Sequence, residues 1–203
     1  MISVRVGDCD VDILPFVNGL QSEADKVRDA YGKHEAYGIA MSIEGVQALE
    51  HREELDDDFG VSELDLVYAN KMERFGTVEM PSPAVCVLVD LCKENGTPLI
   101  PLDMNDADFT ELYCDTVKTL DFVKEHRQAK KGMKKTFDAS TPEELAVQWD
   151  DFVNEIGSYR EVSRKREKYL AEQISDVSKY RKSLLVLLEV ERCDGVVALL
   201  EKR

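Results

Sequence analysis

The sequence predicts a soluble α/β domain with a mainly parallel sheet flanked by helices and an N-terminal hairpin. Three observations support this prediction. Two alternating runs open the chain around a glycine turn, short apolar runs recur at 37–43, 97–102 and 184–190, and amphipathic helical segments separate them. Because helices connect the apolar runs, we expect parallel strands whose carboxyl ends share one edge of the sheet.

The first third of the chain supplies the hairpin and the first helix. Alternating residues at 2–6 and 10–16 flank Gly7, which predicts two antiparallel strands. Ser22 then begins a helix that ends near Gly32. The alternating acids Asp8, Asp10 and Asp12 resemble the start of a calcium loop. The glycine and glutamate that such a loop needs later are missing, so we interpret the three acids as a solvated hairpin edge.

The middle of the chain repeats the pattern of strand, helices and strand. We predict, in order, a strand at 37–43, helices at 46–55, 62–76 and 83–95, an acidic turn at 56–58 between the first two helices, and a strand at 97–102. Glu44 directly follows the first of these strands and Asp103 the second. A site in such a sheet lies beyond the carboxyl ends of its strands, so these two acids are site candidates.

The C-terminal part is predicted to be mostly helical. We expect a helix at 109–126, a flexible basic connection at 130–135, a helix at 142–156, a long helix from 157 to about 180, a strand at 184–190 and a short last helix at 194–200. A capping box, Thr141-Pro-Glu-Glu144, marks the helix at 142. One domain over residues 1–203 is the simplest arrangement, with a possible subdomain seam at 127–140.

Charge and cysteine content limit the partners and the compartment. The net charge of −15 is concentrated in residues 1–125, which hold 27 acidic and 10 basic residues, and such a surface repels nucleic acid. An apolar run long enough for a membrane span is missing, as is a secretory signal. Five cysteines without a C-x-x-C pair indicate reduced thiols and a cytoplasmic location.

The usual catalytic and cofactor motifs are missing. The sequence contains no G-x-S-x-G, no phosphate-binding glycine loop and no G-x-G-x-x-G, and its three histidines are far apart. We therefore predict no cofactor. Glu191 and Arg192 follow the last predicted strand, so they join Glu44 and Asp103 as candidates at the sheet edge. Charged residues also gather at strand ends merely because the chain meets solvent there.

The C-terminal quarter resembles TraB/PrgY-type proteins, which are related to the Tiki and ChaN groups. The resemblance rests on residues 160–174 and 184–200, with Arg166 in the long helix and Gly195-Val196 opening the last one, and on Ile43-Glu44 after an early strand. It implies a TraB/ChaN-like architecture and a metallohydrolase ancestry. The family's C-terminal G-x-x-H is replaced here by Glu189-Val-Glu-Arg192, and the N-terminal motif also lacks its histidine near residues 15–18.

These replacements predict a non-catalytic or altered-function relative, because a guanidinium cannot ligate a metal. The expected role is binding of a small anion or another small ligand, or of a protein partner, through Glu44, Asp103, Arg166, Glu191 and Arg192. The alternative is a divalent-cation-dependent hydrolase, of the metalloprotease or esterase kind, that uses Glu44, Asp103 and Glu191 as ligands. Whether the chain is a monomer or a homodimer built on its long helix stays open.

Overall fold

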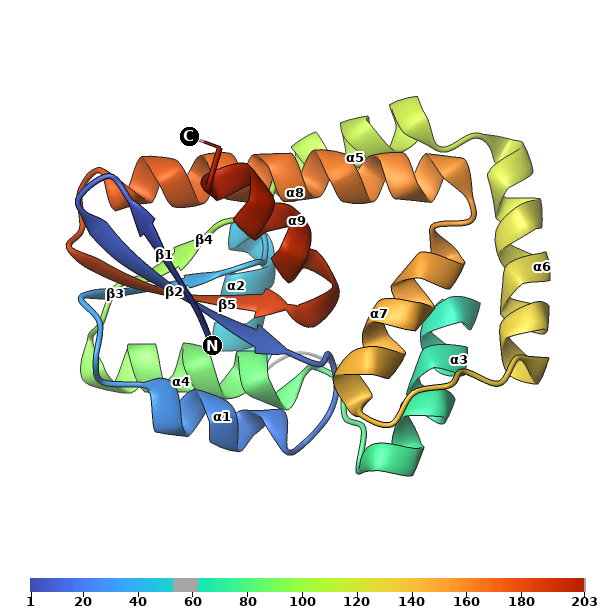
Figure 1. The fold of residues 1–203 in the computed structure, drawn as a ribbon, viewed down its shortest axis with the longest axis horizontal. Helices are drawn as coiled ribbons and strands as arrows, with labels where there is room; N and C mark the ends of the chain where they lie inside the picture. The colour runs from blue at the N-terminus through green and yellow to red at the C-terminus, as the bar shows by residue number, and fades with distance from the viewer. Residues whose placement is uncertain (53–61, 203) are drawn as a thin grey trace.

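A five-stranded sheet forms the centre of the molecule in the computed structural model, which describes residues 1–52 and 62–202 (Figure 1). The described strands are β1 (Ile2–Val6), β2 (Cys9–Phe16), β3 (Ala36–Ile39), β4 (Leu99–Pro101) and β5 (Ser183–Glu189). Their order in the sheet is β1-β2-β5-β3-β4. β1 and β2 form an antiparallel hairpin, and the other neighbouring strands are parallel. The predicted hairpin and mainly parallel sheet are confirmed.

Helices cover both faces of this sheet. The described helices are α1 (Glu23–Ala30), α2 (Ile43–Glu50), α3 (Glu63–Met72), α4 (Pro83–Asn95), α5 (Asp106–Thr116), α6 (Thr119–Lys134), α7 (Pro142–Val153), α8 (Gly157–Ser178) and α9 (Val190–Leu200), with a 3-10 turn, η2, at Glu73–Phe75. α8 and α9 pack on one face, and α1, α2 and α4 on the other. Figure 1 shows α3, α6 and α7 grouped beyond the ends toward which the arrows of β2 and β5 point.

The central strand, β5, is continuously apolar because both of its faces are buried. Leu184, Val186 and Leu188 belong to the core under α8 and α9, whereas Leu185 and Leu187 belong to the core under α1 and α4. All five side chains are buried. A parallel strand that is covered on both faces needs apolar residues at every position, which explains the continuous run.

The helices beyond the sheet have their own apolar core. Trp149 and Phe152 of α7 pack there with Phe137 and with residues of α3 and α6. Val17 and Leu20, which follow β2, are buried in the same core. The helical group is therefore attached to the carboxyl edge of the sheet by side chains that come directly from that edge.

The predicted strand at 37–43 is too long, and this changes the position of Glu44. β3 ends at Ile39, and the Ser42 hydroxyl accepts a hydrogen bond from the Gly45 N–H, which caps α2. Because a capping serine fixes the first helical turn, Glu44 lies in a helix and does not end a strand. The predicted end of this helix at 55 and the acidic turn at 56–58 lie outside the described residues.

The prediction of a helix at 109–126 followed by a flexible basic connection is wrong. Two helices, α5 and α6, cover this region, and the chain is extended at Val117 and Lys118 between them. Asp121 accepts the Lys118 N–H and so caps α6. The basic residues at 130–134 continue this helix, because Ala129 and Gly132 on its other face are buried in the helical group, and the backbone becomes extended at Lys135.

Smaller differences concern helix ends. The last helix begins at Val190, four residues before the predicted start, so Glu191 and Arg192 lie in its first turn. Thr141 caps α7 as predicted by accepting the Glu144 N–H, but the Glu144 carboxylate accepts the Ser140 N–H, so only half of the predicted capping box forms. Gly96, in the left-handed conformation, ends α4 as expected.

Candidate functional site

Two of the predicted site residues, Asp103 and Arg166, form an ion pair at the carboxyl edge of the sheet. Asp103 follows β4, and Arg166 reaches it from α8, donating through Nε to Oδ2 at 2.9 Å and also through the second guanidinium nitrogen. Glu189 Oε1, at the end of β5, lies 3.9 Å from the same guanidinium. The structure thus brings side chains from β4, α8 and β5 together where the sequence predicts a site.

Arg192 forms a second group of ion pairs next to that of Arg166 and Asp103. Its side chain is buried and contacts Asp150 of α7 through one terminal nitrogen, and Glu167 Oε1 of α8 at 3.1 Å through the other. Burying a guanidinium is costly unless carboxylates and hydrogen bonds compensate its charge, and these two carboxylates do so. Arg192 therefore connects α9 to both α7 and α8.

Glu191 is one of two acids at this edge, with Glu189, that have a buried carboxylate oxygen without a hydrogen-bond partner among the described residues. In Glu191 this oxygen is Oε2. Burial raises the pKa of Glu191 to about 7, and the neighbouring charge of Glu189 adds to this, while Arg192 opposes it. A carboxyl group with such a pKa exchanges its proton near neutral pH, which is a common property of binding and catalytic acids.

Tyr68 of α3 provides a further unsatisfied group. Its hydroxyl oxygen is buried without a hydrogen-bond partner in the described part of the chain. Burial raises the pKa of Tyr68, and the charges of Glu191 and Glu23 raise it further. Because buried polar atoms in folded proteins nearly always find a partner, several such atoms in one region need an explanation.

Glu191 and Tyr68 both line one cavity, whose volume is about 490 Å³. Arg166, Arg192 and Asp150 line it too. Aromatic side chains also line it: Phe109, Tyr113, Trp149 and Tyr159. A concave space with aromatic walls and a few converging polar groups is typical of small-ligand sites.

The charges around the cavity are mostly negative. Asp65, Glu125, Asp150 and Glu191 line it together with the guanidinium groups of Arg166 and Arg192. Three further carboxylates do not line the cavity but lie beside these two guanidinium groups: Asp103, Glu167 and Glu189. Each guanidinium already has two carboxylates close to it. The edge of the sheet therefore has a net negative charge even when Glu191 is protonated, and attracts positive charge.

Glu44 is not among the residues that line this cavity. It is exposed in the first turn of α2, and its carboxylate accepts the Asp106 N–H at 3.3 Å. Among residues 1–52 and 62–202, no group of three or more His, Cys, Asp or Glu side chains is placed to hold a metal ion. The alternative ligand set of Glu44, Asp103 and Glu191 is thus not assembled in the described structure.

Sequence reasoning missed four residues of the site. Glu189 could have been found, because it lies two residues before Glu191, near the end of a predicted strand. Glu167 is adjacent to Arg166, but the sequence does not indicate its partner. Asp150 and Tyr68 lie on helices whose position against the sheet depends on the helical core, and nothing in the local sequence around them indicates a site.

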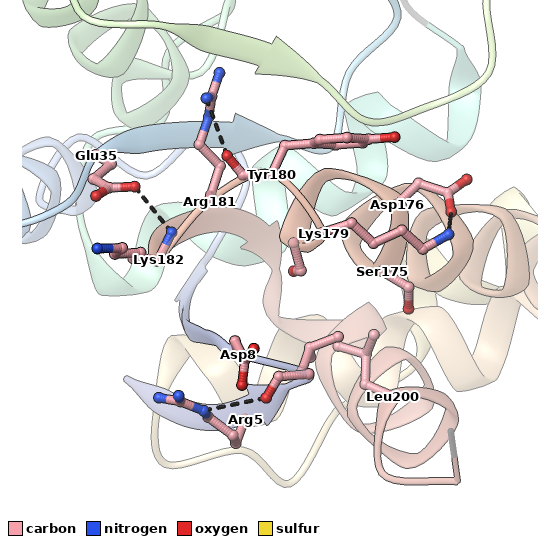
Figure 2. A pocket seen from close by; sticks show the side chains of 13 residues that line it. Arg5, Asp8, Glu35, Ser175, Asp176, Lys179, Tyr180, Arg181, Lys182 and Leu200 are labelled. Atoms are coloured by element: carbon pink, nitrogen blue, oxygen red, sulfur yellow. Dashed lines mark hydrogen bonds and ion pairs between the residues drawn. The ribbon is translucent and has the colours of Figure 1, made fainter.

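A larger cavity, of about 830 Å³, lies at the opposite edge of the sheet (Figure 2). Its charged side chains make local contacts: Arg5 with Asp10, Lys179 with Asp176, and Glu35 with the Lys182 N–H. In Figure 2 the side chains of Arg5, Lys179 and Arg181 point in different directions. Because its charged groups do not converge, this cavity is a weaker site candidate than the one at the carboxyl edge.

Comparison with protein-family models, with curated proteins and with solved structures gave no match. The resemblance to TraB/PrgY-type proteins is therefore still a prediction. Among the helices of the described residues, none combines the length and the apolar character that crossing a bilayer requires.

Proposed function

We propose that the chain is an altered-function relative of TraB/PrgY-type proteins, with their architecture, and that it binds a small ligand in the cavity lined by Glu191 and Tyr68. One observation carries the proposal: Glu191 and Tyr68 line the same cavity at the carboxyl edge of the sheet, and each has a buried polar atom without a partner in the described part of the chain. Leaving such atoms unpaired costs about 1–3 kcal/mol each, and a bound ligand with hydrogen-bonding groups would recover that free energy.

The charges favour a ligand that donates hydrogen bonds and carries positive charge. An anion would need a guanidinium, but Arg166 and Arg192 are each already close to two carboxylates. An ammonium group could pair with the Glu191 carboxylate and lie against the aromatic side chains of the wall. The anion that the sequence suggested is therefore the less favoured ligand, and an organic amine is the more favoured one.

Thermal unfolding in the presence of candidate ligands tests this proposal. At pH 8, where Glu191 is mostly ionised, we expect 1,4-diaminobutane or a similar amine to raise Tm by about 5 °C when its concentration is a hundredfold above Kd. Glu191→Gln should remove most of this increase, and Tyr68→Phe part of it. The matched control is Glu111→Gln, an exposed carboxyl outside the cavity, which should keep the full response.

Two outcomes would contradict the proposal. If phosphate or succinate raises Tm and amines do not, the ligand is anionic and the guanidinium groups are the binding groups. If neither class of compound raises Tm, or if Glu191→Gln responds like the wild type, the cavity does not bind small charged ligands through Glu191.

The pKa of Glu191 favours one second candidate function, hydrolysis with Glu191 as general acid or base. A carboxyl group with a pKa of about 7 exchanges protons efficiently at neutral pH. In this case model esters or peptides should be hydrolysed with a rate that changes around pH 7, and Glu191→Gln should lower it at least about a hundredfold. Metal analysis of protein purified without chelators separates the metal-dependent form of this function from the metal-free form.

A further inference from the structure

The outer surface of the helical group contains an apolar groove between α3 and α6. Its volume is about 380 Å³, and Val67 of α3 and Ala129 of α6 form its buried floor. Leu66 and Met133 stand on either side, with 60 % and 64 % of their surfaces exposed. Two large apolar side chains so exposed beside one concave surface are unusual on a monomer and are typical of an interaction site.

The two helices that form the groove run in the same direction. At one end, His126 Nδ1 of α6 lies 2.6 Å from Glu63 Oε2 of α3, and at the other end the Lys71 ammonium donates to the Met133 carbonyl at 2.9 Å. The groove thus follows about eight residues of each helix, or about 12 Å at 1.5 Å per residue. Two turns of another helix have this length.

A row of positively charged side chains lies along α6, the helix that forms one side of the groove. Arg127, Lys130, Lys131 and Lys134 occur at the spacing i, i+3, i+4, i+7, which places them along one side of the helix. All four are exposed, and no acidic side chain among the described residues pairs with them. In a chain with a net charge of −15, this row is a local exception.

We propose that this groove is the docking site for an acidic amphipathic helix of a partner protein. Apolar side chains at i, i+3 or i+4, and i+7 of such a helix would fill the groove between Leu66 and Met133. Acidic side chains on one flank of that helix would face the row from Arg127 to Lys134. Nucleic acid is the less suitable occupant of this surface, because the groove is apolar and the rest of the chain repels phosphate.

Fluorescence anisotropy with a designed probe tests the proposal on the chain of residues 1–203. The probe is a labelled 15-residue helical peptide with leucines on one stripe and glutamates on the flanks. We expect saturable binding that weakens with added salt, because charged flanks contribute to it. A peptide of identical composition but scrambled order, which has no apolar stripe, should bind at least about tenfold more weakly.

Paired variants show where the peptide binds. Met133→Glu and Lys130→Glu should each weaken binding at least about tenfold, since one places a charge in the groove and the other reverses a charge beside it. Tyr180→Glu and Lys168→Glu are the same two types of change at exposed positions of other surfaces, and should change the affinity less than twofold. All four side chains are exposed, so folding should be retained, which circular dichroism verifies.

Three results would overturn the proposal. The first is equal binding of the ordered and scrambled peptides, or no binding of either. The second is loss of affinity in the two control variants as large as in Met133→Glu. The third is a concentration-dependent dimer that Met133→Glu converts to a monomer, because the groove would then be occupied by a second copy of this chain.

Discussion

At the scale of single residues, the carboxyl edge of the sheet contains satisfied and unsatisfied charges side by side. Arg192 is buried, but two carboxylates compensate its charge. The neighbouring Glu191 has a buried oxygen without a partner in the described residues. Since burial costs much more for an ionised carboxylate than for a neutral acid, Glu191 responds by retaining its proton to a higher pH.

This raised pKa predicts how stability depends on pH. Between the ordinary value of 4.5 and about 7, the folded protein keeps a proton on Glu191 that the unfolded chain has already released. The contribution of Glu191 to the free energy of unfolding is therefore fully present below pH 4.5 and is lost as pH rises through about 7. Compared with wild type, Glu191→Gln should gain stability over this interval, by at most about 3 kcal/mol.

Urea unfolding of both proteins at pH 4.5, 6 and 8 measures this gain. Glu111→Gln again serves as the control, and its difference from wild type should stay the same at all three pH values. A difference between Glu191→Gln and wild type that does not change with pH would show that Glu191 ionises normally in the folded protein.

The residues of the site were predictable only where they are next to strand ends in the sequence. Asp103, Glu191 and Arg192 could be identified because each closely follows an apolar run, and Arg166 because of the family resemblance. Glu44 was assigned to the edge by the same rule, but the Ser42 cap begins a helix before it. Asp150 and Tyr68 reach the cavity only through the packing of α7 and α3, which local sequence does not determine.

At the scale of helices and strands, local signals predicted the elements that have strong ends. Ser82-Pro83 and Gly96 enclose α4, and Thr141 begins α7 as expected. The prediction was wrong at 130–134, where a run of lysines suggested a loop. That run forms one exposed side of α6, and the opposite side is fixed by the contact of Gly132 with the Trp149 and Phe152 rings.

The same contact predicts that Gly132→Ala destabilises the protein. An added Cβ would lie 2.9 Å from the Trp149 ring and 3.2 Å from Phe152, so α6 would have to move away from α7. Overpacking of this kind costs about 1–3 kcal/mol, while alanine stabilises a helix over glycine by about 1 kcal/mol. We therefore expect a net loss of about 1 kcal/mol in the free energy of unfolding, measured by urea denaturation.

Gly157→Ala is the matched control for this change. The new Cβ at position 157 would meet only the end of Arg160, at 3.8 Å, so the helix preference of alanine acts without a clash. This variant should be as stable as wild type or slightly more stable. If Gly132→Ala were as stable as wild type, the close packing of α6 against α7 would not require a glycine at position 132.

At the scale of the whole molecule, the three apolar cores are connected through the carboxyl edge. Val17 and Leu20 extend from β2 into the helical core, and Arg192 joins α9 to Asp150 of α7. The sequence suggested a possible seam at 127–140, but it could not show these connections, because the residues that make them are far apart along the chain. They favour cooperative unfolding of the sheet and the helical group.

Trp149 allows a direct test, since it is the only tryptophan and is buried in the helical core. Its fluorescence reports the unfolding of the helical group, whereas far-ultraviolet circular dichroism reports all helices and strands. If the molecule unfolds as one unit, the two signals should have the same urea midpoint and the same slope. A fluorescence midpoint at lower urea than the circular dichroism midpoint would instead mean that the helical group opens first. The contacts of Val17, Leu20 and Arg192 would then be too weak to couple it to the sheet.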